Sequence, residues 1–473
     1  MVSNLMRSMI LSYRISTIGS KSECHGRLSI VSKMLLQLPP EIVIRILCFL
    51  DLAELASIIQ AGSTLQAYFK TFPILQYRFA TQAAQVEDNP RSTHGSVVTE
   101  RLALLNSREQ GWARLSFNFQ RTIPVLHHLD PIGIYGLVDG VYLLGDESRR
   151  RLHYCKLPSK PSDPTDWSHI DVDCTFVDVG LNIYEHDLIA VVTTKRHLTQ
   201  RRCHIFEVLL LQFSTGKPHP LARSPVLFVG ESSLRRPPIS IDIVGIHLVL
   251  VTSHSINPFQ LCDQFHVFEW QTGTLKMEVQ AQINTYASVV FLSPTLLLLP
   301  NARTAALDVW AIPAVDTDAP THPLVTLALP RLAPGCFVRL ASRGEPNPTM
   351  HSAPASAPAF ATAPGEALII LVARVQLTAL GFGQDADMQR LMMFVRRGDV
   401  LRLVWRAREQ AGLGVLDEGE EILDNAVSQN QDQGGDSNAN ANTNISIDPA
   451  SLPAPSRPTY HVPWLDWGPP MTR

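Results

Sequence analysis

The segment that most restricts how this chain can fold follows the double proline Pro39-Pro40. The ten residues Glu41–Leu50 include eight apolar residues, and the two charged ones, Glu41 and Arg45, have the i, i+4 order that favours a helix. Proline is tolerated at a helix start because its missing N–H would have no partner there. A helix this apolar cannot expose half of its surface to water. We therefore expect one side to pack in a small helical bundle and another side against a second polypeptide.

The residues after this segment predict further short helices. Asp51 and Glu54 have the spacing of a capping box at a helix start. Pro73 interrupts the next helix, and another follows to about residue 84. The range 96–115 has apolar residues at helical spacing and predicts a longer helix that links this bundle to the rest of the chain. Its buried face is expected to comprise Val98, Leu102, Leu105 and Trp112.

The motifs Leu38-Pro39-Pro40-Glu41-Ile42, Ile46-Leu47, Leu50-Asp51-Leu52 and Leu55 together resemble the F-box, over about fifty residues. The leading half matches well, but Ala61–Phe69 lacks the usual Val-Cys/Ser-Lys/Arg followed by Trp. The resemblance implies a non-enzymatic subunit that binds a Skp-type adaptor, which bridges to a cullin scaffold and a RING subunit. It implies that the adaptor-binding residues are Leu38, Pro39, Ile42, Ile46, Leu50, Leu52 and Leu55. Full burial of five of these would contribute roughly 7–15 kcal/mol before association costs.

A second resemblance is to the large F-box family of mushroom-forming fungi. It rests on Leu75-Gln76-Tyr77-Arg78, Asp88-Asn89-Pro90, the run Glu100–Leu105 with Trp112, and the ending Val462–Pro469. Proteins of that family continue past this ending, which implies that the chain is a truncated member. The same motifs carry no known role outside the F-box part.

From about Arg121 the sequence pattern changes to short β-rich runs separated by turn residues. These runs are Ile134–Leu144, Leu188–Thr194, His204–Phe213, His247–Thr252, Gln264–Trp270, Ser288–Leu299, Ala305–Ala311, Ala367–Val372 and Leu391–Arg396. Two end alike, in Phe213-Ser214-Thr215-Gly216 and Trp270-Gln271-Thr272-Gly273, and Leu307–Trp310 is similar without the Thr-Gly. This irregular repeat favours a degenerate β-propeller over the alternative, an irregular β-sandwich.

The predicted fold class is an α+β multidomain protein with a small N-terminal helical F-box followed by an all-β, propeller-like domain. The β-rich part supplies four or five blades, so a strand beyond Arg473 closes the ring, or the ring stays open, or the body is a smaller barrel. The expected organisation is an unstructured extension (1–33), the F-box (34–84), a linker helix (85–120), the propeller-like domain (121–408), an acidic, Asn-rich disordered segment (412–458) and the start of a further strand segment (459–473). The ranges 156–166, 341–363 and 425–458 are rich in small, polar or proline residues and predict loops.

Charge and composition restrict the partners. The formal net charge is −3, and Glu409–Ser456 carries nine acidic residues with no Lys or Arg. We interpret that stretch as a solvated tether, and we expect neither nucleic acid nor membrane as a partner. Residues 1–33 hold five basic residues and one acid, which is typical of a mitochondrial transit peptide or of a plain extension before Met34. The seven scattered cysteines indicate an intracellular protein, cytoplasmic or nuclear.

No catalytic motif is present, so we predict neither enzymatic activity nor a cofactor. His127-His128 and Cys203-His204 are adjacent pairs that point to opposite faces of a strand, and Cys262 and His266 do not suit a strand site either. The arginines at 149–151, 201–202 and 235–236 are expected in solvated loops, or on a face for acidic or phosphorylated substrates. Three hypotheses follow: a ubiquitin-ligase substrate receptor with an unknown protein substrate, a propeller-like interaction scaffold outside ubiquitination, and a quinoprotein-like oxidoreductase.

Overall fold

The computed structural model of the chain describes most of its residues. The described residues are 37–61, 63–92, 97–125, 133–197, 199, 203–232, 234–257, 260–314, 320–330, 336–350, 358–377, 388–410, 460–465 and 467. The predicted extension (1–33) and the acidic segment (412–458) therefore lie outside them. The chain forms two compact units, one comprising residues up to 121 together with 353–363, and the other comprising 122–352 and 364–473.

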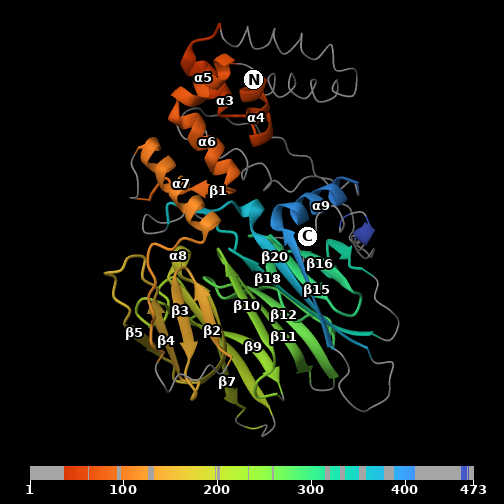
Figure 1. Cartoon of the computed structure of the whole chain (residues 1–473). Coiled ribbons are helices and arrows are strands. Elements are labelled where there is room, and N and C mark those ends of the chain that lie inside the picture. Colours follow the sequence, from red (N-terminus) through yellow and green to blue (C-terminus); the bar gives the residue numbers. More distant parts are fainter. Residues whose placement is uncertain are drawn as a thin grey trace, which may run out of the picture. The chain divides into compact units, whose positions relative to one another are not determined.

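The first unit is helical (Figure 1). Its elements are α3 (Pro40–Leu47), α4 (Leu52–Ala61), α5 (Ser63–Thr71), α6 (Pro73–Ala83), β1 (Val86–Asp88), α7 (Val98–Arg114) and β19 (Phe360–Thr362). The predicted capping box is present: the Asp51 N–H donates to Glu54 Oε2 at 3.1 Å, and the Glu54 N–H donates to Asp51 Oδ1 at 2.8 Å. Pro73 separates α5 from α6, as predicted, and takes the first helical position of α6. In α7, Leu105 is buried but Trp112 is 67% exposed, so the predicted buried face of this helix was partly wrong.

The core of the helical unit is a compact apolar cluster. Its buried members are Val43, Leu47, Leu50, Leu55, Leu65 and Leu75, from α3 to α6 and the turn after α3. Val43 and Leu47 are four residues apart, so they lie on the same face of α3 and turn it into the bundle.

A short strand from much later in the chain completes the helical unit. β19 pairs antiparallel with β1, with Val86 opposite Thr362, and the Asn89 N–H donates to the Ala359 carbonyl at 2.9 Å. The prediction that 341–363 is a loop was therefore wrong at both ends, since β18 runs to Glu345 and β19 covers Phe360–Thr362. These strands were missed because their small and polar residues gain β-structure only from the strands that they pair with.

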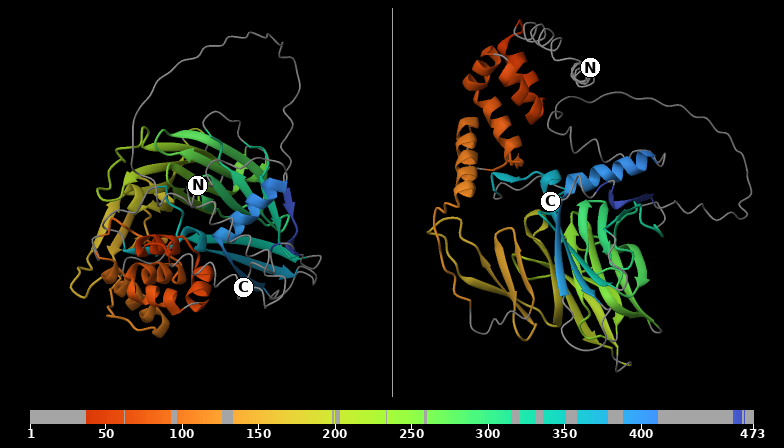
Figure 2. Two further views of the ribbon diagram at one scale, coloured as in Figure 1. Left: turned by 90° about the horizontal axis from the view of Figure 1, so that it is seen from above. Right: turned by 45° about the vertical axis from the view of Figure 1, so that its right-hand side comes forward.

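The second unit is a five-bladed, propeller-like β-domain, which confirms the predicted fold class (Figure 2). The first sheet contains β2 (Tyr135–Val138), β3 (Val141–Gly145), β4 (Arg151–Lys156) and β5 (Trp167–Asp171), and the second β6 (Thr175–Asn182), β7 (Leu188–Arg196), β8 (His204–Gln212) and β9 (Val226–Ser232). The third contains β10 (Ile239–Val244), β11 (His247–Asn257), β12 (Gln260–Glu269) and β13 (Thr274–Gln282). The fourth contains β14 (Val290–Ser293), β15 (Leu296–Asn301), β16 (Ala306–Ala311), β17 (Val325–Ala328) and β22 (Tyr460–Val462), and the fifth β18 (Cys336–Glu345), β20 (Leu368–Leu377) and β21 (Met388–Arg396).

The first strands of successive sheets pack against one another, β2 on β6, β6 on β10, β10 on β14 and β14 on β18. Glycines allow this close approach. A Cβ on Gly180 would lie 3.0 Å from Ile241, and a Cβ on Gly344 would lie 2.5 Å from Val290. Short helical turns, α8 (Ile183–His186) and η1 (Pro364–Glu366), and the longer α9 (Arg397–Gln410) connect or follow the strands.

Two of the predicted β-runs are hairpins and not single strands. The run Ile134–Leu144 turns at Asp139-Gly140, where both residues have positive φ (55° and 71°), as a tight two-residue hairpin turn requires. The run Ser288–Leu299 also contains a turn, at Pro294-Thr295 between β14 and β15. The helix α9 was not predicted at all, since it begins at Arg397 directly after a strand and its charged residues hide the apolar stripe.

The aromatic residues at the ends of the similar sequence runs occupy corresponding positions in their sheets. Phe213 and Trp270 directly follow β8 and β12, and Trp310 lies in β16; each of these strands is the third in its sheet. Gly216 and Gly273 have φ of 67° and 79°, so both Thr-Gly pairs lie in turns, as predicted. The weak repeat in the sequence is therefore the repeat of the blade.

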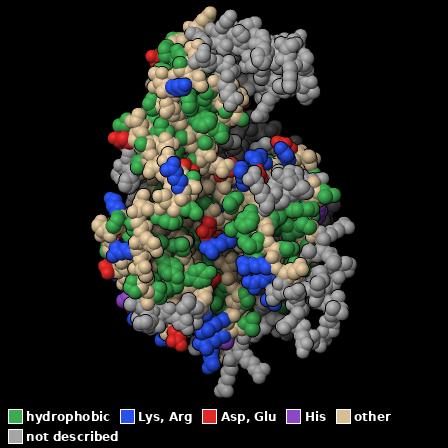
Figure 3. Space-filling view, in the orientation of Figure 1, with side chains coloured by type: hydrophobic (Ala, Val, Ile, Leu, Met, Phe, Trp, Pro, Cys, Tyr) green, Lys and Arg blue, Asp and Glu red, His purple; other side chains and the backbone are tan. Residues whose placement is uncertain are grey.

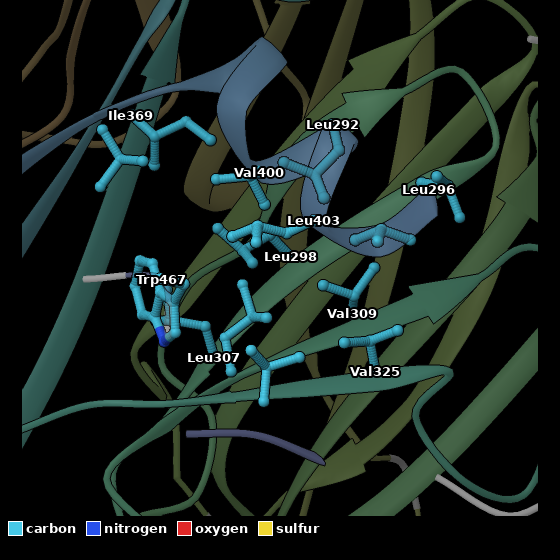
Figure 4. Packing of buried hydrophobic residues seen from close by; sticks show 14 of the residues in the cluster. Leu292, Leu296, Leu298, Leu307, Val309, Val325, Ile369, Val400, Leu403 and Trp467 are labelled. Atoms are coloured by element: carbon cyan, nitrogen blue, oxygen red, sulfur yellow. The ribbon is translucent and has the colours of Figure 1, made fainter. Parts of the chain in front are cut away.

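The largest apolar cluster lies under α9, where the fourth and fifth sheets meet (Figure 4). It includes Leu298 and Val309 of the fourth sheet, Ile369 of the fifth sheet, Val404 of α9 and the fully buried Trp467. The segment predicted to start a further strand contributes β22, which runs parallel to β17 at the edge of the fourth sheet. Within the described residues, no helix has the length and apolar character needed to cross a membrane.

Candidate functional site

The structure divides the predicted adaptor-binding residues into two groups. Leu38, Pro39 and Ile42 are exposed, with 38% of Leu38 and 46% of Ile42 accessible, and Ile46 and Leu52 are half-buried. Leu50 and Leu55 are 5% and 0% exposed because they belong to the core of the helical unit. They cannot contact an adaptor without unfolding, so the available surface is smaller than the sequence predicted.

The sequence analysis missed one exposed aromatic residue, Phe49. Helix α3 ends at Leu47, and the Phe49 N–H donates to the Ile46 carbonyl at 3.1 Å in the turn that follows. Phe49 follows Ile46 by three residues, just beyond the end of the helix. Phe49 is 61% exposed. We define the α3 face as Leu38, Pro39, Ile42, Ile46 and Phe49.

Charged residues border the α3 face. Glu41 lies in the first turn of α3 and Arg45 in the last turn, so each is placed favourably for the helix dipole. Both are exposed. The face is therefore an apolar patch with a polar rim, which is the usual anatomy of a protein-binding surface.

The motifs that resemble the fungal F-box family form one network in the helical unit. Arg101, 9% exposed, donates to the carboxylate of Asp88, to the Asn89 carbonyl at 3.1 Å and to the Ser92 carbonyl at 3.3 Å. Burial, together with the negative charge of Asp88, raises the pKa of Tyr77 to about 12. These motif residues hold the segment after α6 against α7, which is a structural role.

The C-terminal motif also packs inward. Trp467 donates from Nε1 to the Ala328 carbonyl at 2.9 Å, and the ring of Trp464 meets it edge-on with centroids 5.0 Å apart. Within the described residues, the motif therefore stabilises the fourth sheet and offers no chemistry.

Two of the basic clusters noted in the sequence meet at one end of the propeller-like unit. Arg149 and Arg236 line a cavity of about 300 Å³ together with Asp178 and the prolines at 237–238. The Arg149 Nη1 donates to the Val177 carbonyl at 3.5 Å. Burial lowers the pKa of Arg149, and the charge of Arg236 lowers it further. Burial raises the pKa of Asp178 to about 6. The cavity therefore combines two arginine side chains with a carboxyl group that keeps its proton to a higher pH than usual.

In the described part of the chain, no three His, Cys, Asp or Glu residues are grouped to hold a metal ion. Cys262 and His266 both lie in β12, as the strand prediction required. His127-His128 lies outside the described residues. The expectation that the protein is not an enzyme stays a prediction.

Comparisons with known proteins give only remote likenesses. No family model matches the chain, and no curated protein sequence matches it significantly. Among solved structures, the C-terminal WD40 domain of Sif2 is 11% identical over 56% of this chain and 61% of that domain, with a TM-score of 0.27. KlAtg21 in its complex with the coiled coil of AgAtg16 is 10% identical over 54% of this chain and 76% of its own, with a TM-score of 0.29. Hsv2p of Kluyveromyces lactis is 9% identical over 54% of this chain and 81% of its own, with a TM-score of 0.22.

Proposed function

We propose that the chain is an F-box-type substrate receptor of an SCF-type ubiquitin ligase. In this proposal the α3 face docks on a Skp-type adaptor that is joined to a cullin, and the propeller-like unit binds a protein substrate. The observation that carries the proposal is the exposure of Ile42 on α3 and of Phe49 in the turn after it, while Val43 and Leu47 of the same helix already fill the core. A small unit that leaves such side chains in water gains stability when a second protein covers them.

The α3 face alone gives a modest binding energy. The exposed fractions of Leu38, Ile42 and Phe49 are 38%, 46% and 61%. At about 1.5–3 kcal/mol for each fully buried side chain, covering these fractions contributes roughly 2–4 kcal/mol. A micromolar complex needs about 8 kcal/mol after association costs. We therefore expect the adaptor to contact further residues of the helical unit beyond the α3 face.

The test is a pull-down of the full chain with a co-expressed Skp-type adaptor. The double variant Ile42→Asp/Ile46→Asp places two carboxylates on the α3 face, and we expect it to lose the adaptor. The matched control is Leu221→Asp/Leu275→Asp, which adds the same charge at side chains that are 59% and 44% exposed in the propeller-like unit. Circular dichroism on each variant verifies that the helices remain folded. Adaptor binding that survives the α3 substitutions, or is lost equally in the control, would refute this docking mode.

The alternative is a propeller-like interaction scaffold that has no part in ubiquitination. It predicts that no Skp-type adaptor is recovered with the wild-type chain, while protein partners are recovered equally from wild type and from Ile42→Asp/Ile46→Asp. Mass spectrometry on the same pull-down separates the two functions, because it reports the adaptor and any substrate together.

A further inference from the structure

The fifth sheet has two very different faces. Ile369 and Val395 point toward the cluster under α9, and Gly344 lets this face approach Val290 of β14. Side chains alternate along a strand, so the neighbours of these residues point to the opposite face. That opposite face is largely exposed, and Figure 3 shows Lys and Arg side chains beside hydrophobic ones over the region of β18 and β20.

Three arginines form a row across this exposed face. Arg339 of β18 is opposite Arg374 of β20, and Arg374 is opposite Arg390 of β21. All three are exposed, and among the described residues neither Arg374 nor Arg390 forms an ion pair with an acidic side chain. Like charges directly opposite one another destabilise a sheet. A row of this kind therefore favours a ligand that brings negative charge.

Apolar rows follow directly after the arginine row. Val372 is opposite Met392, and Ile370 is opposite Phe394, with Met392 49% and Phe394 38% exposed. At the far end of the face, Arg396 forms an ion pair with Glu366 at 3.0 Å. We call this surface the arginine face. Along its edge strand β21 it presents Arg390, Met392, Phe394 and Arg396 in turn. On β18, two strands away from this edge, the same face carries Arg343 and Glu345, which form an ion pair with each other.

The arginine face ends at a strand edge. The fifth sheet has the order β18-β20-β21, so within the described residues β21 has a partner on one side only, whereas the other four blades contain at least four strands. An edge strand offers unpaired N–H and C=O groups to an added strand. A strand placed beside β21 would extend each row by one side chain, at positions next to Arg390, Met392, Phe394 and Arg396.

We propose that the arginine face binds an extended acidic segment of another protein, which pairs with β21 as an additional strand. The side chains of β21 at this edge specify the pattern of that segment: acidic residues at positions 1 and 7, apolar residues at 3 and 5, and any residue at 2, 4 and 6. The pattern is the same in both directions, so it suits a parallel or an antiparallel strand. Backbone hydrogen bonds to the edge provide affinity, and the alternate side chains provide specificity.

Other occupants fit the arginine face less well. A second copy of the chain would place one arginine row near another, which the charges oppose. Nucleic acid would satisfy the arginines, but single strands bind on several stacking aromatic rings, and Phe394 is the one aromatic residue in these rows. The chain's own acid-rich stretch Glu409–Ser456 is the remaining competitor, and the experiment below includes it.

The inference extends the proposed function by naming a class of protein partner, yet it rests on the fifth sheet alone. Binding at the arginine face should be unchanged in Ile42→Asp/Ile46→Asp. Loss of the adaptor and loss of the acidic segment are therefore separate results.

The probe is a fluorescein-labelled seven-residue peptide with glutamate at positions 1 and 7, valine at 3 and 5, and threonine elsewhere. Its binding to the full chain is followed by fluorescence anisotropy at low and high salt. We expect Arg374→Gln/Arg390→Gln to weaken binding at least about tenfold, and high salt to weaken binding to wild type. The matched control, Arg150→Gln/Arg235→Gln, removes two exposed arginines elsewhere in the same unit and should change the affinity less than twofold.

A charge swap distinguishes recognition from a general effect of charge. Arg390→Glu should lose the glutamate peptide and gain binding to the same peptide with lysine at both ends. Equal binding of the glutamate peptide to wild type and Arg374→Gln/Arg390→Gln would overturn the proposal. So would tighter binding of a single-stranded oligonucleotide at the same arginines. The proposal would also fail if changing the acids of Glu409–Ser456 to amides strengthened peptide binding tenfold, since the chain's own segment would then be the occupant.

Discussion

At the scale of single residues, the centre of the propeller-like unit contains charge that is only partly compensated. Arg397 is 1% exposed, and burial lowers its pKa to about 10. Asp242 of β10 accepts from Asn347 Nδ2 at 2.6 Å and from the Ile243 N–H at 3.0 Å. Burial nevertheless raises the pKa of Asp242 to about 6, although these donors and the charge of Arg397 oppose the shift. Asp242 therefore keeps its proton to a higher pH than an exposed carboxyl group does.

Asp242 should make the stability of the propeller-like unit depend on pH. Between pH about 4 and about 6 the folded chain holds a proton on Asp242 that the unfolded chain has released. This stabilising contribution is complete below pH about 4 and is lost as pH rises through about 6, by up to about 3 kcal/mol. Asp242→Asn keeps an acceptor for Asn347 but cannot ionise. In urea titrations its free energy of unfolding, relative to wild type, should therefore rise between pH 4.5 and 7.5.

The exposed Glu147→Gln is the control for the pH experiment, and it should follow the wild-type curve. A constant difference between wild type and Asp242→Asn across this pH range would contradict the shifted pKa.

The α3 face shows which single residues a sequence can and cannot place. The F-box resemblance included Ile42, which is exposed, and left out Val43 and Leu47, which are buried in the core of the helical unit. The resemblance placed Leu50 and Leu55 on the surface, although both are buried, and it did not include Phe49, which is exposed. The side that residues 48–50 face depends on where α3 ends. The sequence around Leu47 contains no glycine or proline that would mark the end of the helix.

At the scale of elements, the spacing between blades depends on a glycine. The side chain that Gly344→Ala adds would lie 2.5 Å from Val290, which is 1% exposed and cannot move aside into solvent. We expect this variant to lose about 1–3 kcal/mol of unfolding free energy in urea titrations. Gly365→Ala is the control, because its nearest neighbour is 3.8 Å away, and it should change stability by less than about 0.5 kcal/mol.

A double-mutant cycle identifies the cause of the Gly344 effect. If the contact with Val290 is responsible, Gly344→Ala/Val290→Ala should cost less than the sum of the two single variants. Additive losses would mean that the added methyl group acts elsewhere.

Most of the strands that the sequence predicted are buried on both faces. Most of the strands that it missed have an exposed face. β7 and β15 are apolar along most of their length, so they stand out in the sequence. β5, β9 and β13 are the last strands of their sheets and carry many exposed residues, so their pattern resembles that of loops. Their strand structure comes from pairing with a neighbour, which a local pattern does not contain.

At the scale of the whole molecule, distant parts of the chain complete each unit. The helical unit includes β19 (residues 360–362), which pairs with β1, and the fourth sheet includes β22 (residues 460–462), which pairs with β17. The sequence predicted four or five β-rich blades, enough to indicate a propeller, because the strands of each blade are close together in the sequence. It could not predict that β19 pairs with β1 or that β22 pairs with β17, since nothing near β1 or β17 specifies a partner that lies more than a hundred residues away.

Trp467 attaches the segment that contains β22 to the fourth sheet. It is 0% exposed in the cluster under α9, and its Nε1 donates to Ala328, 139 residues earlier in the chain. Trp467→Ala should remove about 3–5 kcal/mol of unfolding free energy from the propeller-like unit in urea titrations. Leu465→Ala, in the same segment but 79% exposed, should change it by less than about 0.5 kcal/mol. Contacts between such distant residues are expected to form late in folding, so the loss should accelerate unfolding and leave the refolding rate nearly unchanged in stopped-flow experiments. A Trp467→Ala variant as stable as Leu465→Ala would show that β22 is a loosely attached edge and that the fourth sheet is complete without it.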